Sequence, residues 1–187
     1  MGAEQLSDGD LLRRCANGDE EAFLILYRRH QGPVFRFALH MSGNREIAEE
    51  ITQEVFVAML TGQRYAPEQG SLQAYLIGVA RNQVRRQRRE FHALASGEAD
   101  STGEQLLDEL AREQELGALR KAILKLPPNY REVVVLCDLE GVDYAQAARQ
   151  LGCALGTVRS RLHRARAILQ AKLQRSGMPR RREKCPV

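Results

Sequence analysis

Two arginine-rich stretches are the chemically distinctive parts of this sequence. Residues 81–89 hold five arginines in nine positions, and residues 157–171 hold four arginines and no acidic residue. Guanidinium groups bind phosphates through paired, charge-assisted hydrogen bonds. Crowded arginines repel one another unless an anion screens them, so both stretches favour contact with a polyanion such as nucleic acid. The alternative for each is a solvated helix surface, where arginine is common and is mildly favourable near a helix C-terminus.

The first stretch forms the second half of a helix predicted over residues 71–90. Ser71 is the expected N-cap, and the apolar residues that follow recur at the spacing of one buried helical face. That face comprises Leu72, Tyr75, Leu76 and Val79. The opposite face carries Arg81, Arg85, Arg88 and Arg89, with Asn82 at its edge. The helix is therefore expected to dock through its first half and to extend a cationic half beyond the core.

The second stretch belongs to a helix-turn-helix pattern near the C-terminus. A short helix is capped by Asp143 and ended by Gly152, and a second helix over residues 155–174 is capped near Gly156 and Thr157. This geometry places a basic recognition helix in the major groove of DNA. The inward face of the second helix holds Val158, Leu162, Ala165 and Leu169. Its outward and flanking positions are Thr157, Arg159, Ser160, Arg161, His163, Arg164, Arg166 and Ala167.

The remaining periodic segments also read as helices, so the expected fold class is all-α. Ser7, Asp19 and Asn44 are the expected N-caps of three earlier helices, and Gly32-Pro33 is expected to break the second of these helices. The helix after Asn44 is amphipathic. Its apolar stripe comprises Ile47, Ile51, Val55, Phe56 and Met59, and its outer faces carry Glu49, Glu50, Gln53 and Glu54.

Composition and charge exclude several classes of protein. The chain has 187 residues, 43% of them hydrophobic, and a net charge of +4. No stretch approaches the roughly 20 apolar residues of a membrane helix, and the N-terminus does not resemble a secretory signal, so a cytosolic protein is expected. Three scattered cysteines (Cys15, Cys137 and Cys153) are expected to be buried small hydrophobes, and Cys185 could be an exposed thiol. No zinc site or other cofactor is expected.

The chain divides by composition into two helical domains. Residues 1–93 form the first expected domain and residues 113–175 the second. Between Leu94 and Glu115 there are seven acidic residues and one arginine, so residues 94–112 are expected to be a flexible acidic linker. Residues 176–187 form a basic tail. If both domains bound one DNA duplex, binding by one basic surface would raise the effective concentration of the other and so the overall affinity.

Beyond composition, the sequence resembles the extracytoplasmic-function (ECF) group of bacterial RNA polymerase sigma factors, in the sigma-70 superfamily. Two helices of sigma region two are matched by AEEITQEVFVAML (48–60) and SLQAYLIGVARNQVRRQRR (71–89). Sigma region four is matched almost throughout residues 126–169 by LPPNYREVVVLCDLEGVDYAQAARQLGCALGTVRSRLHRARAIL. The resemblance implies a protein that binds core polymerase, selects promoters through two DNA elements and helps to melt the DNA, in an envelope or environmental stress response.

The resemblance also implies a role for particular residues. Binding to the polymerase β′ clamp helices falls to Glu49, Glu50, Gln53, Glu54 and Phe56. Contact with the minus-ten element falls to Tyr65, Ser71, Tyr75, Arg81, Asn82, Arg85, Arg86, Arg88 and Arg89. Contact with the minus-thirty-five element falls to Thr157, Arg159, Ser160, Arg161, His163, Arg164 and Arg166. Further implied partners are the polymerase β flap and an anti-sigma factor, which could hold this cytoplasmic protein at the inner membrane.

Some positions depart from the family pattern. Tyr75 stands where a tryptophan is common, Glu50 replaces the usual aspartate, and Ala147 replaces a larger aliphatic residue. Ala154 occupies a usual proline position, and Asp143 replaces a serine-like cap. These changes remove no functional group, and they bear on promoter sequence more than on function.

Two other classes of function remain as alternatives. An autonomous helix-turn-helix regulator would explain the C-terminal pattern, but it would need neither an acidic docking helix nor the arginines at 81–89. An enzyme has little support, because the sequence contains no phosphate loop, metal-ligand cluster or nucleophile-base grouping.

Overall fold

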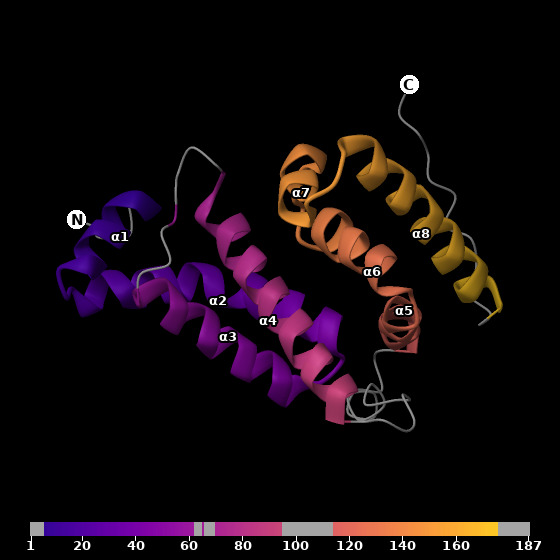
Figure 1. Cartoon of the computed structure of the whole chain (residues 1–187), viewed down its shortest axis with the longest axis horizontal. Helices are drawn as coiled ribbons and strands as arrows, with labels where there is room; N and C mark the ends of the chain where they lie inside the picture. Colours follow the sequence, from indigo (N-terminus) through magenta and orange to yellow (C-terminus); the bar gives the residue numbers. More distant parts are fainter. Residues whose placement is uncertain (1–5, 62–64, 66–69, 95–113, 176–187) are drawn as a thin grey trace.

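The computed structural model describes residues 6–61, 65, 70–94 and 114–175 (Figure 1). Every regular element in these ranges is a helix, which confirms the all-α prediction. Four helices form an N-terminal block: α1 (Asp8–Ala16), α2 (Glu20–Ser42), α3 (Arg45–Leu60) and α4 (Leu72–Leu94). The C-terminal block contains α5 (Gln114–Leu124), α6 (Pro128–Val134), a π-helical turn η3 (Val135–Leu139), α7 (Tyr144–Leu151) and α8 (Leu155–Arg175).

The predicted helix starts are set by local hydrogen bonds. The side chains of Ser7, Asp19, Asn44 and Asp143 accept backbone N–H groups of the first helical turn, as the sequence predicts. Ser71 does the same for α4, because its hydroxyl oxygen accepts the Ala74 N–H at 3.3 Å. These caps fix where each helix begins, and so fix which residues point inward.

The N-terminal block packs around α2, which contacts α1, α3 and α4. In the C-terminal block α8 lies against α5, α6 and α7. The apolar stripes predicted for α3, α4 and α8 are largely buried, so these helices dock as the sequence predicts. Burial in α4 continues beyond Ala80 to Val84, one turn further than the stripe expected from the sequence.

One expected helix break is wrong. α2 continues through Gly32 and Pro33 to Ser42 as a single 23-residue helix. Pro33 lacks an N–H, so one backbone bond of the helix is missing. Packing on both sides of this position outweighs that loss, since the core includes Leu26, Val34, Phe37, Ala38 and Met41.

Two details of the C-terminal block also differ from the expectation. α6 passes into the π-helical turn η3, which a regular helical period does not predict, and the Glu140 N–H donates to the carbonyl of Val135 at 3.0 Å. α8 begins at Leu155, and the N–H groups of Thr157 and Val158 donate to the Ala154 carbonyl, so the cap lies before Gly156. The predicted linker and basic tail fall outside the described residues, apart from the last residue of α4.

The two blocks lie against each other, with α4 running along their boundary (Figure 1). α2 contacts α5 and η3, and α4 contacts α7. Polar contacts also cross this interface. Arg131 of α6 donates to the Met41 carbonyl of α2 at 2.8 Å, and Arg36 of α2 pairs with Glu140 at 3.3 Å. The sequence did not predict these contacts between the blocks.

Candidate nucleic-acid interface

The outward face of α8 is open to solvent. Val158, Leu162, Ala165 and Leu169 are no more than 8% exposed and anchor the helix. The structure exposes Arg159, Ser160, His163, Arg164, Arg166 and Ala167, and leaves Thr157 and Arg161 half-buried. Every polar side chain predicted to contact DNA from this helix is therefore on or beside one accessible face, with the chemistry for base edges and phosphates.

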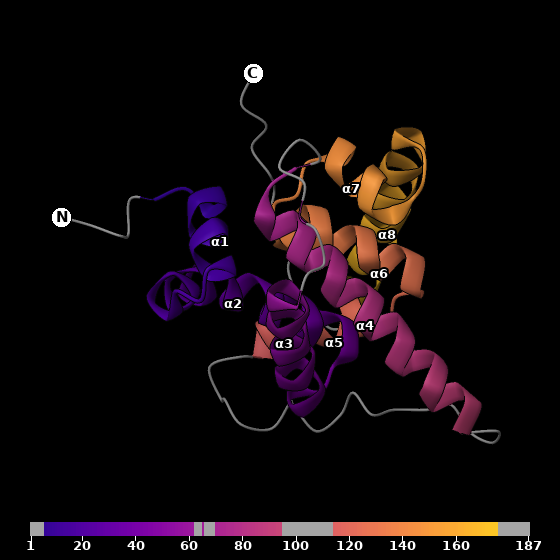
Figure 2. The ribbon, with the colours of Figure 1, turned by 60° about the vertical axis from the view of Figure 1, so that its left-hand side comes forward.

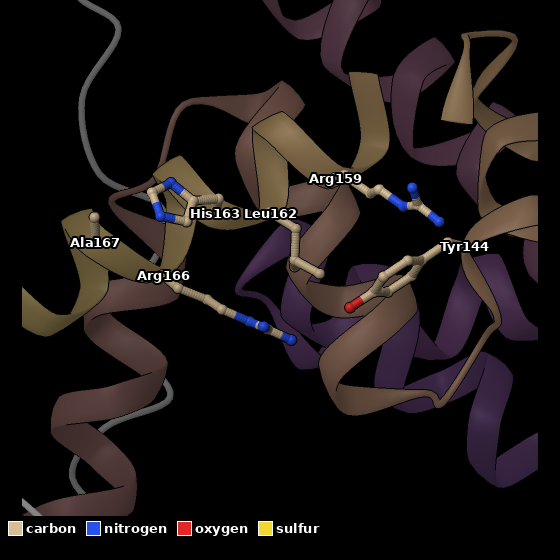
Figure 3. A pocket seen from close by; sticks show the side chains of 6 residues that line it. All are labelled: Tyr144, Arg159, Leu162, His163, Arg166 and Ala167. Carbon is tan, nitrogen blue, oxygen red and sulfur yellow. The ribbon is translucent and has the colours of Figure 1, made fainter. Parts of the chain in front are cut away.

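Arg166 differs from its neighbours because it already has an anionic partner. Its Nε and Nη2 atoms lie 3.1 and 2.5 Å from the two carboxylate oxygens of Asp138 in η3. These hydrogen bonds raise the pKa of Arg166 above its usual value, and Tyr144 adds to the effect. The side chains of Arg159 and Arg166 reach toward Tyr144 around a surface hollow also lined by His163 (Figure 3).

The cationic half of α4 divides into a covered part and an open part. Arg81 is only 7% exposed and lies between the two blocks. Asn82, Arg85, Arg86, Arg88 and Arg89 are exposed. The end of α4 extends past the other helices (Figure 2), so the predicted cationic extension is present, except that its first arginine is covered.

Two aromatic rings lie near the start of α4, one from Tyr75 in the helix and one from Tyr65 before it. The Tyr65 hydroxyl donates to the Gly70 carbonyl at 2.8 Å, and its ring lies 5.7 Å from that of Tyr75 at an angle of 57°. Burial raises the pKa of Tyr75. Aromatic faces at such a site offer a stacking surface for an unpaired base. Ser71, the remaining predicted contact here, is exposed and serves as the helix cap.

α3 presents an acidic face next to these arginines. Glu49, Glu50 and Gln53 are exposed and Glu54 is half-buried, as expected for the outer faces of an amphipathic helix. Phe56, by contrast, is 2% exposed and packs edge-on against Tyr27 at 4.8 Å between ring centroids. In this conformation Phe56 supports the acidic face from inside the core.

The acidic face of α3 also contacts α4. Glu54 lies 3.5 Å from Arg86, and Gln87 donates to Glu50 at 3.0 Å. Glu50 and Arg86 are exposed, and Glu54 and Gln87 are half-buried, so these contacts are weak. The candidate protein-docking surface and the candidate DNA surface therefore adjoin.

Other kinds of site find no support in the described ranges. They contain no group of three or more histidine, cysteine, aspartate or glutamate side chains placed to hold a metal ion. None of their helices is both long enough and apolar enough to cross a membrane.

Comparisons with known proteins assign both blocks. A family model for sigma-70 region 2 matches residues 26–91, and one for sigma-70 region 4 matches residues 116–169. The chain is 32% identical to the ECF RNA polymerase sigma factor SigM of Mycobacterium tuberculosis, over 90% of this chain and 85% of that protein. This chain belongs to the ECF family of RNA polymerase sigma factors. The family assignment expected from the sequence is thereby confirmed.

A further relative and two solved structures are also similar to this chain. The ECF RNA polymerase sigma factor SigE of Mycolicibacterium smegmatis is 38% identical over 83% of this chain, which spans 64% of the length of that relative. Among solved structures, CnrH in complex with the cytosolic domain of CnrY has a TM-score of 0.69 at 26% identity and covers 90% of this sigma factor and 97% of CnrH. The sigma factor RpoE of Bartonella quintana, in complex with the anti-sigma factor NepR, has a TM-score of 0.67 at 26% identity, covering 81% and 96% of the two chains.

Three residues of this sigma factor that sequence reasoning missed lie against the predicted DNA contacts. Asp138 pairs with Arg166, Glu132 pairs with Arg81, and Gln150 accepts a hydrogen bond from Arg81 through its carbonyl. No local pattern marks an acidic residue that pairs across 28 or 51 positions, so only the tertiary structure reveals these partners.

Proposed function

We propose that this sigma factor binds core RNA polymerase, directs it to specific promoters and helps to open the DNA. The observation that carries the proposal is the presence of both sigma modules, region 2 and region 4, in order on one chain. A regulator that only bound DNA would need the second module alone. The protein would perform no catalysis of its own, and the polymerase would do the chemistry in the cytoplasm.

The protein would contact the promoter at two places. The exposed face of α8 would read the minus-thirty-five element, with Ser160, His163 and Arg164 toward the bases or phosphates and Arg159 beside them. The arginines of α4 with Asn82 would hold the upstream edge of the minus-ten element. Tyr65 and Tyr75 would stack on an unpaired base, which offsets part of the cost of flipping it.

Core polymerase would dock on the acidic face of α3. Glu49, Glu50, Gln53 and Glu54 present a polar surface suited to the basic side chains of a partner helix, here the β′ clamp helices. The β flap would contact the C-terminal block. Phe56 would contribute indirectly, by holding α3 against Tyr27.

Regulation would come from an anti-sigma factor, in an envelope or environmental stress response. Support comes from the two similar solved structures, one of which is a sigma factor bound to an anti-sigma factor. An anti-sigma factor in the membrane would hold the protein at the inner membrane, and a soluble one would not.

The decisive experiment is transcription from genomic DNA by purified core polymerase with and without this protein. We expect new transcripts whose upstream sequences share two elements separated by a constant spacing. If the protein instead bound promoter DNA tightly without core polymerase and produced no new transcripts, the autonomous regulator would replace the sigma factor as the assigned function.

A matched pair of variants tests the docking surface. Glu50→Lys together with Glu54→Lys should reduce capture of core polymerase at least tenfold, because two attractive contacts become repulsive. Glu20→Lys with Glu21→Lys, in the first turn of α2, makes the same charge change elsewhere. Unchanged capture by the α3 variant, with its helical content intact, would contradict the assignment of α3.

A further inference from the structure

An ion pair with Asp138 engages one arginine of the cationic face of α8. Arg166 donates from Nε to one carboxylate oxygen at 3.1 Å and from Nη2 to the other at 2.5 Å. The arginine side chain is 55% exposed and the aspartate side chain 27%, so the pair lies at the surface, beside the side chains assigned to DNA. A guanidinium bound through two nitrogens in this way has its positive charge compensated by the carboxylate.

The π-helical turn η3 carries Asp138. The Glu140 N–H bonds to a carbonyl five residues back, so η3 is wider than an α-helix and its side chains project in other directions than those of a regular turn. The nearby acids have other partners, because Glu140 pairs with Arg36 of α2 and Asp143 caps α7. Residues 157–171 contain no acid. Among the described residues, Asp138 is thus the carboxylate that pairs with an arginine of α8.

Tyr144, the first residue of α7, lies on another side of the same guanidinium. The Arg166 side chain reaches toward Tyr144 across the surface hollow (Figure 3). Hydrogen bonds to Asp138, with a smaller effect from Tyr144, raise the pKa of Arg166, so the arginine is held in its charged form. Arg159 and Arg164 are exposed, and neither has an ion pair within the described part of the chain. The arginines of α8 are therefore not equivalent as ligands for DNA.

We propose that Asp138 masks Arg166 and so sets how strongly the recognition helix α8 binds duplex DNA of any sequence. This inference rests on the proposed function, which assigns α8 to the minus-thirty-five duplex. An arginine that neutralises a phosphate releases condensed counterions and adds to the affinity for every sequence. Arg166 must first give up its pair with Asp138, so its contribution to that affinity is reduced.

Masking leaves sequence reading to the side chains of α8 that have no anionic partner. Ser160, His163 and Arg164 are exposed on the same helix. Phosphate contacts position a protein on a duplex but carry no sequence information directly. With one such contact withheld, α8 binds DNA in general more weakly, and stable binding depends more on a second contact made by the tethered N-terminal block. Asp138 is therefore a positioning residue, which acts on DNA binding through Arg166.

The test compares the wild-type full chain with Asp138→Asn, which keeps the size of the side chain and removes its charge. The probe is a fluorescein-labelled random-sequence DNA duplex, and binding is followed by anisotropy over a series of salt concentrations. We expect roughly fivefold tighter binding, because Arg166 no longer gives up an ion pair before it binds a phosphate. The slope of log K against log salt should become steeper by about 1. Glu21→Gln, an exposed residue of α2, is the control for the change in net charge.

A double-mutant cycle shows whether the effect passes through Arg166. Asp138→Asn in an Arg166→Ala background should change the duplex affinity by less than about twofold, because the arginine that it would release is absent. A general effect of the lost negative charge would instead tighten binding equally in both backgrounds. Circular dichroism checks that each variant keeps the helicity of the wild type.

Three outcomes would overturn the proposal. One is an Asp138→Asn protein with wild-type affinity and salt slope, which would mean that Arg166 is not masked in the native protein. Another is weaker binding, in which case Asp138 would instead orient Arg166 toward DNA. The third is an equal gain in affinity with and without Arg166.

Transcription by core polymerase with the wild-type protein tests the proposed function separately. If transcripts appeared together with any of these three outcomes, the sigma function would stand and the masking of Arg166 would not. If no transcripts appeared and the duplex-binding results were as expected, the masking would stand and the sigma function would not.

Discussion

Arg164 and Arg166 are two positions apart on α8 but differ in their contacts with the rest of the protein. Arg164 is exposed, and no ion pair is found for it in the described residues. Arg166 is held by both carboxylate oxygens of Asp138, which ties the recognition helix to η3. The helical wheel drawn from the sequence puts Arg164 opposite the buried face and Arg166 on its flank, and the family resemblance assigns both to DNA contact. The structure separates them because Asp138 lies on another element.

Arg164→Ala should therefore weaken duplex promoter binding without destabilising the fold. Loss of one phosphate contact should reduce affinity roughly fivefold and lower the slope of log K against log salt by about 1. Arg166→Ala should cost up to about 1 kcal/mol of unfolding free energy, a Tm decrease of roughly 2–4 °C, because its pair with Asp138 is partly exposed. Salt-dependent anisotropy and thermal unfolding measure the two effects. Equal Tm values for the two variants would contradict this division.

Cys137 in η3 should be nearly inert as a thiol. Burial, with a smaller effect from Asp138, raises its pKa to about 11. Since only the thiolate is nucleophilic, alkylation at pH 8 should be roughly a hundredfold slower than for an ordinary thiol. Mass-mapped labelling with iodoacetamide in native buffer and in urea provides the measurement, with Cys137 in the unfolded chain as its own control. Similar rates in both conditions would show that η3 opens readily.

At the level of elements, the sequence predicts best the features that depend on residues within one helical turn, such as helix caps and buried faces. The caps Ser7, Asp19, Asn44 and Asp143 were predicted because each bonds to an amide three residues away. The exposed faces of α3 and α8 follow from the same 3.6-residue period. The π-helical turn and the continuity of α2 were not predicted, because packing between helices decides both.

Pro33 provides a direct test of how packing holds α2 together. Pro33→Ala would restore a backbone N–H donor to the carbonyl of Arg29 in a helix whose flanking turns are already buried. We expect an increase in unfolding free energy of about 1–3 kcal/mol, visible as a higher Tm by circular dichroism. A lower Tm would mean that α3 and α4 pack against a bend in α2 that requires proline.

For the whole molecule, the prediction of two helical modules is confirmed, and the arrangement of the modules did not follow from it. Both modules have their own apolar periodicity, which a single sequence displays. The interface between them depends on isolated polar residues such as Arg36, Glu132 and Gln150. Their pairing partners lie 104, 51 and 76 positions away, and no periodic pattern encodes such distances.

Arg131 should couple the stability of the two blocks. Its guanidinium donates to the Met41 carbonyl of the N-terminal block and to the Leu124 and Leu126 carbonyls of its own block. Arg131→Lys leaves a single ammonium group that cannot reach all three acceptors. We expect a loss of about 2–3 kcal/mol, a Tm lower by roughly 5–10 °C, and a radius of gyration larger than that of the wild type.

The matched control for Arg131 is Arg45→Lys, an exposed arginine that pairs with Glu49 one helical turn away. Its Tm should change by less than about 2 °C, because exposed pairs contribute little. If Arg131→Lys lowered the Tm without expanding the protein, Arg131 would serve only the turn between α5 and α6. If it also expanded the protein, the bond to the Met41 carbonyl would be one of the contacts that hold the two blocks together.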